Sequence, residues 1–108
     1  MNVEIRERNV PMDEALREYA DQRLRLTLSR FANRIGRVCV QFEELDAGIT
    51  RCELSVTLDH GEVLSVDDQS ADVRFILDHA TNRLGRLVAR ALERQRGAGR
   101  PPRLGNVR

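Results

Sequence analysis

Apolar and polar residues alternate in four short segments of the chain, a spacing typical of β-strands. The four segments are residues 2–8, 37–43, 51–59 and 63–68. In the first of them, Val3 and Ile5 alternate with polar and charged neighbours, which predicts a half-buried strand. A turn over residues 59–62, built around Gly61, separates the last two segments and predicts that they form a hairpin.

Two longer segments carry apolar residues at helical spacing. The first extends over residues 14–33 and follows Asp13, a residue type that caps helix N-termini, and Gly36 is expected to stop the helix near its end. The second helix is expected to begin after Asp72 or Ser70 as its cap. Its predicted buried stripe consists of Val73, Leu77, Ala80, Leu84, Leu87, Val88 and Ala91.

The order β-α-β-β-β-α predicts an α+β fold, with a largely antiparallel four-stranded sheet and two helices packed on one face. The length of 108 residues favours a single domain, expected over residues 1–96. Glycines and prolines end the periodicity after that point, so residues 97–108 are expected to form a flexible basic tail. The chain has no signal-peptide pattern and no run approaching the ~18 apolar residues of a membrane span, which predicts a cytoplasmic protein.

The two cysteines do not form a recognisable metal or redox motif. Cys39 lies opposite the apolar face of its strand, whereas Cys52 lies on the apolar face of its own strand. The two sulfurs are therefore expected on opposite sides of the sheet, where they cannot form a disulfide. Their spacing is not that of a zinc site, and we expect neither a metal nor a cofactor.

Charge is distributed very unevenly along this nearly neutral chain. Residues 1–37 carry eight arginines and six acidic residues, residues 38–72 carry one and nine, and residues 73–108 carry nine and two. The corresponding net charges are +2, −8 and +7. Every basic residue other than histidine is arginine, whose planar guanidinium can bind a phosphate through two hydrogen bonds. Such a division points to a polyanionic partner.

The arginines of the second helix share one face. Within a sector of about 80° around the helix lie Arg83, Arg86, Arg90 and Arg94. Glu93 is the only acidic neighbour, although like charges four residues apart repel each other. The first helix has a similar sector, comprising Arg23, Arg30 and Arg34 with Tyr19 beside them.

Three interpretations of these sectors remain open: a surface for nucleic-acid phosphates, a solvated helix face, or a surface for an acidic protein. The chain has no Trp, one Tyr and three Phe, and Phe31 and Phe42 are expected in the core. A stacking platform for single strands is therefore poorly supplied, which favours recognition of structured RNA through its phosphates and shape.

Catalysis has little support in the sequence. His60 and His79 have no nucleophile pattern beside them, and the acidic residues lack the spacing of an EF-hand. We therefore expect a protein that is not an enzyme, and a metal-assisted hydrolase using the acidic loops is the weakest alternative. The stronger alternative is a protein–protein regulator that uses its acidic middle and its arginine-rich helix.

Both helices contain motifs of a known family. Residues 14–19 read Glu-Ala-Leu-Arg-Glu-Tyr and residues 31–35 read Phe-Ala-Asn-Arg-Ile. The second helix contains Asp72-Val73, Leu77-Asp78, Ala80 and Arg83-Leu84. Over residues 2–96 the chain resembles the ribosome hibernation-promoting factor and ribosome-associated inhibitor family, in its short form. Arg74 replaces a usual aromatic residue and Ile76 a usual small one, which suggests a divergent branch.

The resemblance implies a domain that binds the 16S rRNA of the small ribosomal subunit, lies in the channel used by tRNA and mRNA, and silences translation under stress. It implies no small-molecule substrate and no membrane, and we expect a monomer. The expected rRNA contacts are Arg23, Arg30, Arg34, Arg83, Arg86, Arg90, Arg94 and Tyr19.

Overall fold

The computed structural model describes residues 1–98 as a four-stranded mixed sheet covered by two α-helices. The elements are β1 (Asn2–Arg8), α1 (Glu14–Leu28), the 3₁₀ helix η1 (Ser29–Arg34), β2 (Ile35–Glu44), the 3₁₀ helix η2 (Asp46–Gly48), β3 (Thr50–Leu58), β4 (Val63–Ser70) and α2 (Val73–Ala98). The strand order is β1-β2-β3-β4, with β1 parallel to β2 and the other two pairs antiparallel. The predicted α+β class and element order are confirmed.

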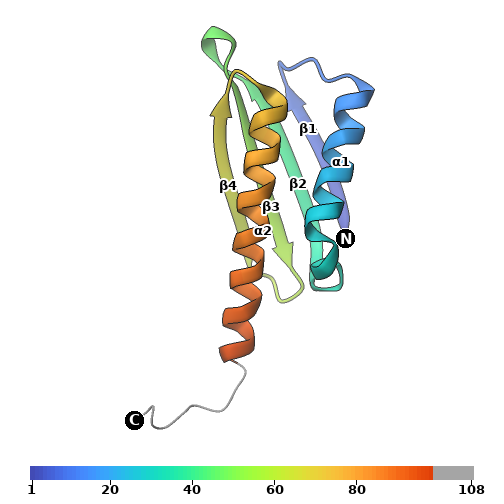
Figure 1. Cartoon of the computed structure of the whole chain (residues 1–108), viewed down its shortest axis with the longest axis vertical. Helices are drawn as coiled ribbons and strands as arrows, with labels where there is room; N and C mark the ends of the chain where they lie inside the picture. Colours follow the sequence, from blue (N-terminus) through green and yellow to red (C-terminus); the bar gives the residue numbers. More distant parts are fainter. Residues whose placement is uncertain (99–108) are drawn as a thin grey trace.

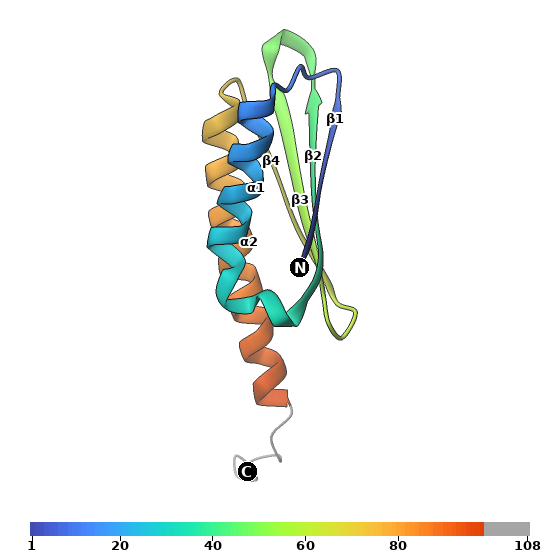
Figure 2. The same cartoon turned by 90° about the vertical axis from the view of Figure 1, so that its right-hand side faces the viewer.

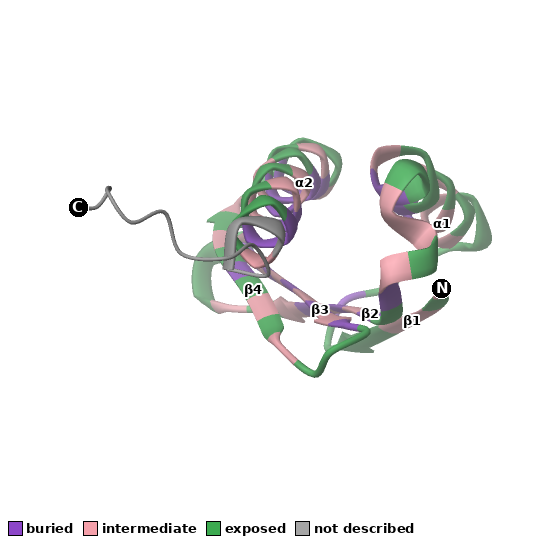
Figure 3. Cartoon of the chain, turned by 90° about the horizontal axis from the view of Figure 1, so that it is seen from below, coloured by how far each residue is buried: buried purple, intermediate pink, exposed green. Residues whose placement is uncertain are grey.

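Both helices lie on the same face of the sheet and run side by side (Figures 1 and 2). Seen along the molecule, the buried residues lie between the helix layer and the sheet layer, and the opposite face of the sheet is open to solvent (Figure 3). The helices begin at the same end of the molecule, and the final part of α2 extends past the end of the sheet (Figures 1 and 2).

Alternation along the strands places one set of side chains in the core. Val38, Val40 and Phe42 of β2 are fully buried, as is Cys52 of β3. Burial raises the pKa of the Cys52 thiol to about 12. Cys39, one position away from two core valines, is half-buried on the other face of the sheet, and both cysteines are free thiols. The expected placement of the cysteines on opposite faces is therefore confirmed.

The two helices approach each other closely at a glycine. A Cβ atom added at Gly85 of α2 would lie only 2.9 Å from Cγ2 of Thr27 on α1. Because Thr27 is branched at its β-carbon, its methyl group has little freedom to move away. Glycine at this position therefore sets the spacing between the helices.

The C-terminal end of the first helix differs from the prediction. The predicted α-helix over residues 14–33 is wrong in its C-terminal part, because α1 ends at Leu28. The tighter 3₁₀ helix η1 follows and connects the helix layer to β2 in the sheet. Gly36 is not a helix stop either. It lies within β2, at a register shift between Ile35 and Arg37.

The predicted helix caps are present. The carboxylate of Asp13 accepts a hydrogen bond from the Leu16 amide at 2.8 Å, and that of Asp72 accepts one from the Phe75 amide at 3.0 Å. The hydroxyl of Ser70 instead accepts a hydrogen bond from the Asp72 amide. Helix α2 extends to Ala98, and the rest of the expected tail over 97–108 lies outside the described residues.

The Thr81 hydroxyl offers a test of the core. This side chain is fully buried in α2, and its Oγ1 has no hydrogen-bond partner among the described residues. Because an unpaired buried hydroxyl is destabilising, we expect Thr81→Val to raise the free energy of unfolding by about 1 kcal/mol in urea denaturation. Thr27→Val is the matched control, since Oγ1 of Thr27 accepts a hydrogen bond from Arg23 at 2.9 Å, and it should not be stabilising. A loss of stability in Thr81→Val would show that the Thr81 hydroxyl has a hydrogen-bond partner in the folded protein.

Candidate nucleic-acid interface

Arg23 and Tyr19, two of the predicted contacts, form a hydrogen-bonded network between the helices. Oδ1 of Asp78 accepts hydrogen bonds from the Tyr19 hydroxyl at 2.6 Å and from Nε of Arg23 at 3.1 Å. The other guanidinium nitrogens of Arg23 donate to Thr27 at 2.9 Å and to Asn82 at 3.0 Å. The Arg23 side chain is only 29% exposed. It therefore fixes α1 against α2, and Asp78 and Asn82 are members of the site that the sequence analysis did not identify.

The ring of Tyr19 is covered by a second arginine. The guanidinium carbon of Arg74 lies 4.4 Å from the ring centroid, a cation–π arrangement. The hydrogen bond from the Tyr19 hydroxyl to the Asp78 carboxylate raises the pKa of the tyrosine, and partial burial acts in the same direction. Tyr19 thus has a packing role in the free protein, beside the core.

Arg83 shares a carboxylate with a histidine at the edge of the sheet. Nη1 of Arg83 lies 2.8 Å from Oδ2 of Asp68 on β4, and Nε2 of His79 lies 3.4 Å from the same oxygen. The side chains of Arg83 and His79 remain 40% and 49% exposed. One acidic residue therefore orients two basic side chains of α2 and leaves a large part of each accessible.

Arg34 and Arg94 are also paired within the molecule. Nε of Arg34 donates to Asp59 at 2.8 Å, and Nη2 donates to the side-chain oxygen of Gln95. The hydrogen bond from Arg34 lowers the pKa of the Asp59 carboxyl. Nη2 of Arg94 lies 3.5 Å from Glu62, and its side chain is 65% exposed, so solvent screens this pair strongly.

Three predicted contacts remain without an acidic partner in the part of the chain that the structure describes. Arg30, Arg86 and Arg90 are all exposed, and none of them forms an ion pair with residues 1–98. The guanidinium carbon of Arg30 lies 4.7 Å from the ring centroid of Phe31, which holds it beside the core. These three side chains supply most of the uncompensated positive charge on the helix face.

A shallow hollow between the helices brings two of these arginines together. It measures about 290 Å³ and is lined by Thr27, Arg30, Asn82, Gly85, Arg86 and Ala89. The lining from α2 also includes Ala89, whose small side chain leaves the floor of the hollow open between the two arginines. A second hollow of about 160 Å³ lies along α2 and is lined by Arg83, Arg86, Leu87 and Arg90. Arg86 borders both hollows and connects the two helices' cationic surfaces.

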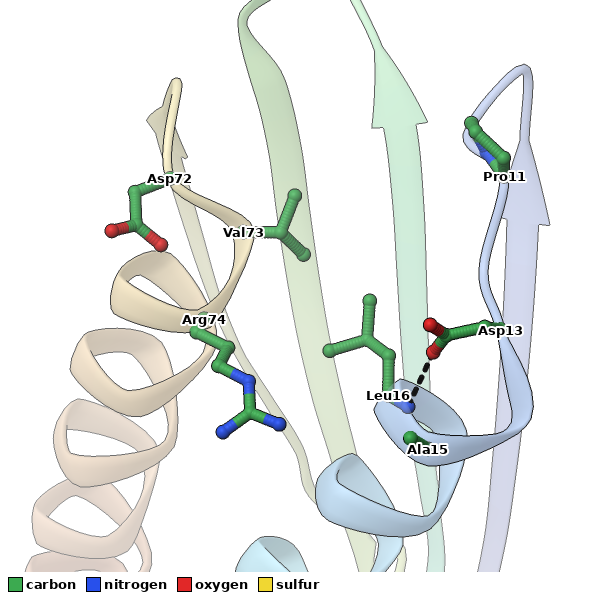
Figure 4. A pocket seen from close by; sticks show the side chains of 7 residues that line it. All are labelled: Pro11, Asp13, Ala15, Leu16, Asp72, Val73 and Arg74. Carbon is green, nitrogen blue, oxygen red and sulfur yellow. Dashed lines mark hydrogen bonds between the residues drawn. The ribbon is translucent and has the colours of Figure 1, made fainter.

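Another hollow, of about 350 Å³, lies where the two helices begin (Figure 4). Its lining includes Asp13 and Asp72, and its only basic residue is Arg74, which points into the space between the helices (Figure 4). The two carboxylates already accept hydrogen bonds from helix amides and add negative charge. This hollow is therefore unfavourable for phosphate, in contrast to the hollow lined by Arg30 and Arg86.

Within residues 1–98, no three potential ligand side chains lie close enough together to hold a metal ion. Several of the acidic residues that the hydrolase alternative requires are paired with arginines. Over the same range, no helix is long and apolar enough to cross a membrane.

Titration of Tyr19 provides a test of the network between the helices. The chain has one Tyr and no Trp, so the rise in phenolate absorbance at alkaline pH reports on this residue alone. We expect its midpoint to lie above the ordinary value of about 10, and Asp78→Asn to move it back towards that value. Asp21→Asn, which removes an acid paired with Arg25 on the same helix, should leave it unchanged.

The same titration fixes the sign of a pH effect on stability. Because the folded state raises the Tyr19 pKa, the stabilisation from this hydrogen bond is complete below the unfolded-state pKa. It is lost as the pH rises through the folded-state pKa. Equal titration curves for the native chain and Asp78→Asn would exclude the hydrogen bond.

Comparison with known proteins places the chain among ribosome-associated proteins. No curated protein matches it. The N-terminal domain of Protein Y from Thermus thermophilus is similar in structure, with a TM-score of 0.68 and 26% identity over 83% of this chain and 98% of that one. A ribosomal subunit interface protein from Coxiella burnetii has a TM-score of 0.74 and 18% identity, over 86% and 99% of the two chains. The family model for the sigma 54 modulation protein / S30EA ribosomal protein matches residues 3–96, so the chain belongs to this family, which confirms the resemblance carried by its two helices.

Proposed function

We propose that this protein binds the 16S rRNA of the small ribosomal subunit in the tRNA and mRNA channel and silences translation by occupying it. The mechanism is steric and involves no bond chemistry. The observation that carries the proposal is the exposed trio of Arg30, Arg86 and Arg90, which have no acidic partner in the described chain and border two hollows between and along the helices. The relative from Coxiella burnetii is described as a ribosomal subunit interface protein, which is consistent with such a partner.

The predicted contacts divide by their chemistry in the free protein. Arg30, Arg86 and Arg90 are ready to bind phosphates, because no ion pair within residues 1–98 must be broken first. Three further arginines can bind phosphates by giving up or sharing an ion pair with an acidic residue of the chain: Arg83, Arg94 and Arg34. These pairs are exposed, so breaking them costs little stability in water. Arg23 and Tyr19 belong to the same surface and hold the two helices at a fixed separation.

This function implies a monomeric protein in the cytoplasm that acts under stress, when translation stops. The alternative of a protein–protein regulator requires the acidic middle of the chain to be available. Three arginines from outside this region, Arg34, Arg83 and Arg94, pair with its residues Asp59, Asp68 and Glu62. Within the region, Arg51 lies within ion-pair distance of Asp67, Glu43 and Glu53. Because several of the acidic residues are neutralised within the chain, the structure favours RNA over a basic protein as the partner.

Charge reversal on α2 tests the proposed surface. We expect Arg86→Glu combined with Arg90→Glu to reduce affinity for small ribosomal subunits by about a hundredfold or more in co-sedimentation, because both lost contacts are charge-assisted. The matched control reverses Arg8 and Arg37, which are 65% and 60% exposed and lie on the other face of the sheet. Both variants should unfold near the native temperature. Equal losses of binding in the two variants would show that net charge, and not this surface, determines affinity.

Salt dependence tests the same surface in a different way. Each neutralised phosphate contributes about −0.7 to −0.9 to the slope of log K against log salt concentration. We expect a steep slope for the native protein and a slope smaller by about one unit for Arg30→Gln. Arg6→Gln, on the open face of the sheet and paired with Glu4, should keep the native slope. A flat response of the native protein would contradict an electrostatic interface.

A further inference from the structure

We infer that Phe75, stacked on His79, is a platform on which an unpaired base of the bound RNA stacks; this inference rests on the proposed function. Among the described residues, Phe75 is the exposed aromatic side chain, at 59%. Phe42 is fully buried, and Phe31 and Tyr19 pack against the core. The low aromatic content predicted no stacking platform, whereas the fold leaves Phe75 accessible on α2.

The histidine beside Phe75 holds the platform in place. The two rings are nearly parallel, with an interplanar angle of 9° and a centroid separation of 5.9 Å. On its other side, Nε2 of His79 lies 3.4 Å from the Asp68 carboxylate of β4. The backbone amide of Phe75 donates to Asp72, which fixes the first turn of α2. The ring is therefore ordered before any ligand binds, and little side-chain entropy remains to be lost.

Phe75 continues the arginine-rich face of α2 towards the start of the helix. At about 100° per residue, Phe75 lies about 20° from Arg86 and about 60° from Arg90 around the axis. Along the axis, Phe75 precedes Arg83 by about 12 Å and Arg86 by about 16 Å. A strand whose phosphates contact these arginines can therefore place a base near the ring.

The chemistry of this surface favours a nucleobase over an apolar protein segment. Phe75 is neighboured on α2 by His79 and Arg83. Two carboxylates lie nearby and both are engaged within the protein: that of Asp68 is shared between these two basic residues, and that of Asp72 accepts a hydrogen bond from the backbone amide of Phe75. An apolar segment covering Phe75 would remove the ion pair of Arg83 with Asp68 from water without offering either group a new partner, which is costly. A base presents an aromatic face to Phe75, while the phosphates of the same strand pair with the arginines that follow on α2.

The absence of tryptophan from the chain allows a direct test of stacking. Phe75→Trp places the only tryptophan of the chain at the platform, and we expect its fluorescence to be quenched when small ribosomal subunits or protein-free 16S rRNA bind. Leu26→Trp is the matched control, because Leu26 is 74% exposed on α1 and lies outside the arginine-rich face of α2. Its fluorescence should be unchanged in the same titrations.

Affinity measurements complete the test. We expect Phe75→Ala to bind both probes about tenfold more weakly, with an unchanged salt slope, because stacking of one base involves no charge. Phe75→Tyr should bind like the native chain, and Leu26→Ala serves as the control for loss of an exposed apolar side chain. Thermal unfolding of each variant verifies the fold, and the tryptophan variant supplies the readout if Phe75→Ala does not fold.

The outcomes separate this inference from the proposed function. The platform would be overturned if the fluorescence of Phe75→Trp were not quenched in a saturated complex and Phe75→Ala bound with native affinity. Binding through Arg86 and Arg90 would be unaffected by that result. Quenching by intact subunits but not by protein-free rRNA would show that a ribosomal protein covers Phe75, and would overturn it as well. If the native chain binds neither probe, both the platform and the proposed function fail.

Discussion

Burial of one face of α2 against the sheet determines where the arginines of that helix point. Leu77, Leu84 and Val88 are fully buried between the layers, and transfer of each such side chain out of water contributes about 1.5–3 kcal/mol. Rotation of α2 about its axis would expose this apolar stripe to water. The free energy of burying the stripe therefore also keeps the opposite side of the helix facing solvent. The arginines on that side, which we propose bind phosphates, are therefore kept on one surface by the packing of the helix itself. The hydrophobic core thus supplies the orientation on which the proposed interface depends.

Folding also decides which charges remain available. The acidic middle of the sequence, residues 38–72, becomes most of β2, the 3₁₀ helix η2, and the hairpin of β3 and β4. Within this region, β4 lies beside α2 (Figure 1). Asp68 and Glu62 then meet Arg83 and Arg94, so some charges that are segregated along the sequence pair in space. Arg86 and Arg90, which are exposed on α2, have no such partner within residues 1–98. Uncompensated positive charge is concentrated in this way on the surface that we propose binds an extended polyanion.

Sequence patterns were sufficient to predict the fold, but they did not predict which arginines have acidic partners within the protein and which have none. Alternation and helical spacing predicted the strands and helices, because burial on one face imposes a period on each element. The transition from α1 to η1 was missed, since the pattern of Phe31 and its neighbours also fits a continued α-helix. Which arginines have partners depends on contacts across the fold, such as that of Asp68 with His79 and Arg83, which no local pattern encodes. The exposure of Phe75 likewise results from tertiary packing.

The hydrogen-bonded network between the helices makes the surface around the hollow rigid, which suits a structured RNA as the proposed partner. Arg23 makes hydrogen bonds from three nitrogens to α1 and α2, and a lysine could not reproduce that planar arrangement. Together with the contact at Gly85, it fixes the separation of Arg30 and Arg86, which border the hollow between the helices. A fixed separation matches a structured RNA, whose phosphates are themselves held at set positions, because neither surface must lose much freedom on binding. A mobile chain of basic residues would bind the same charge, but it would not distinguish a folded RNA from any other polyanion.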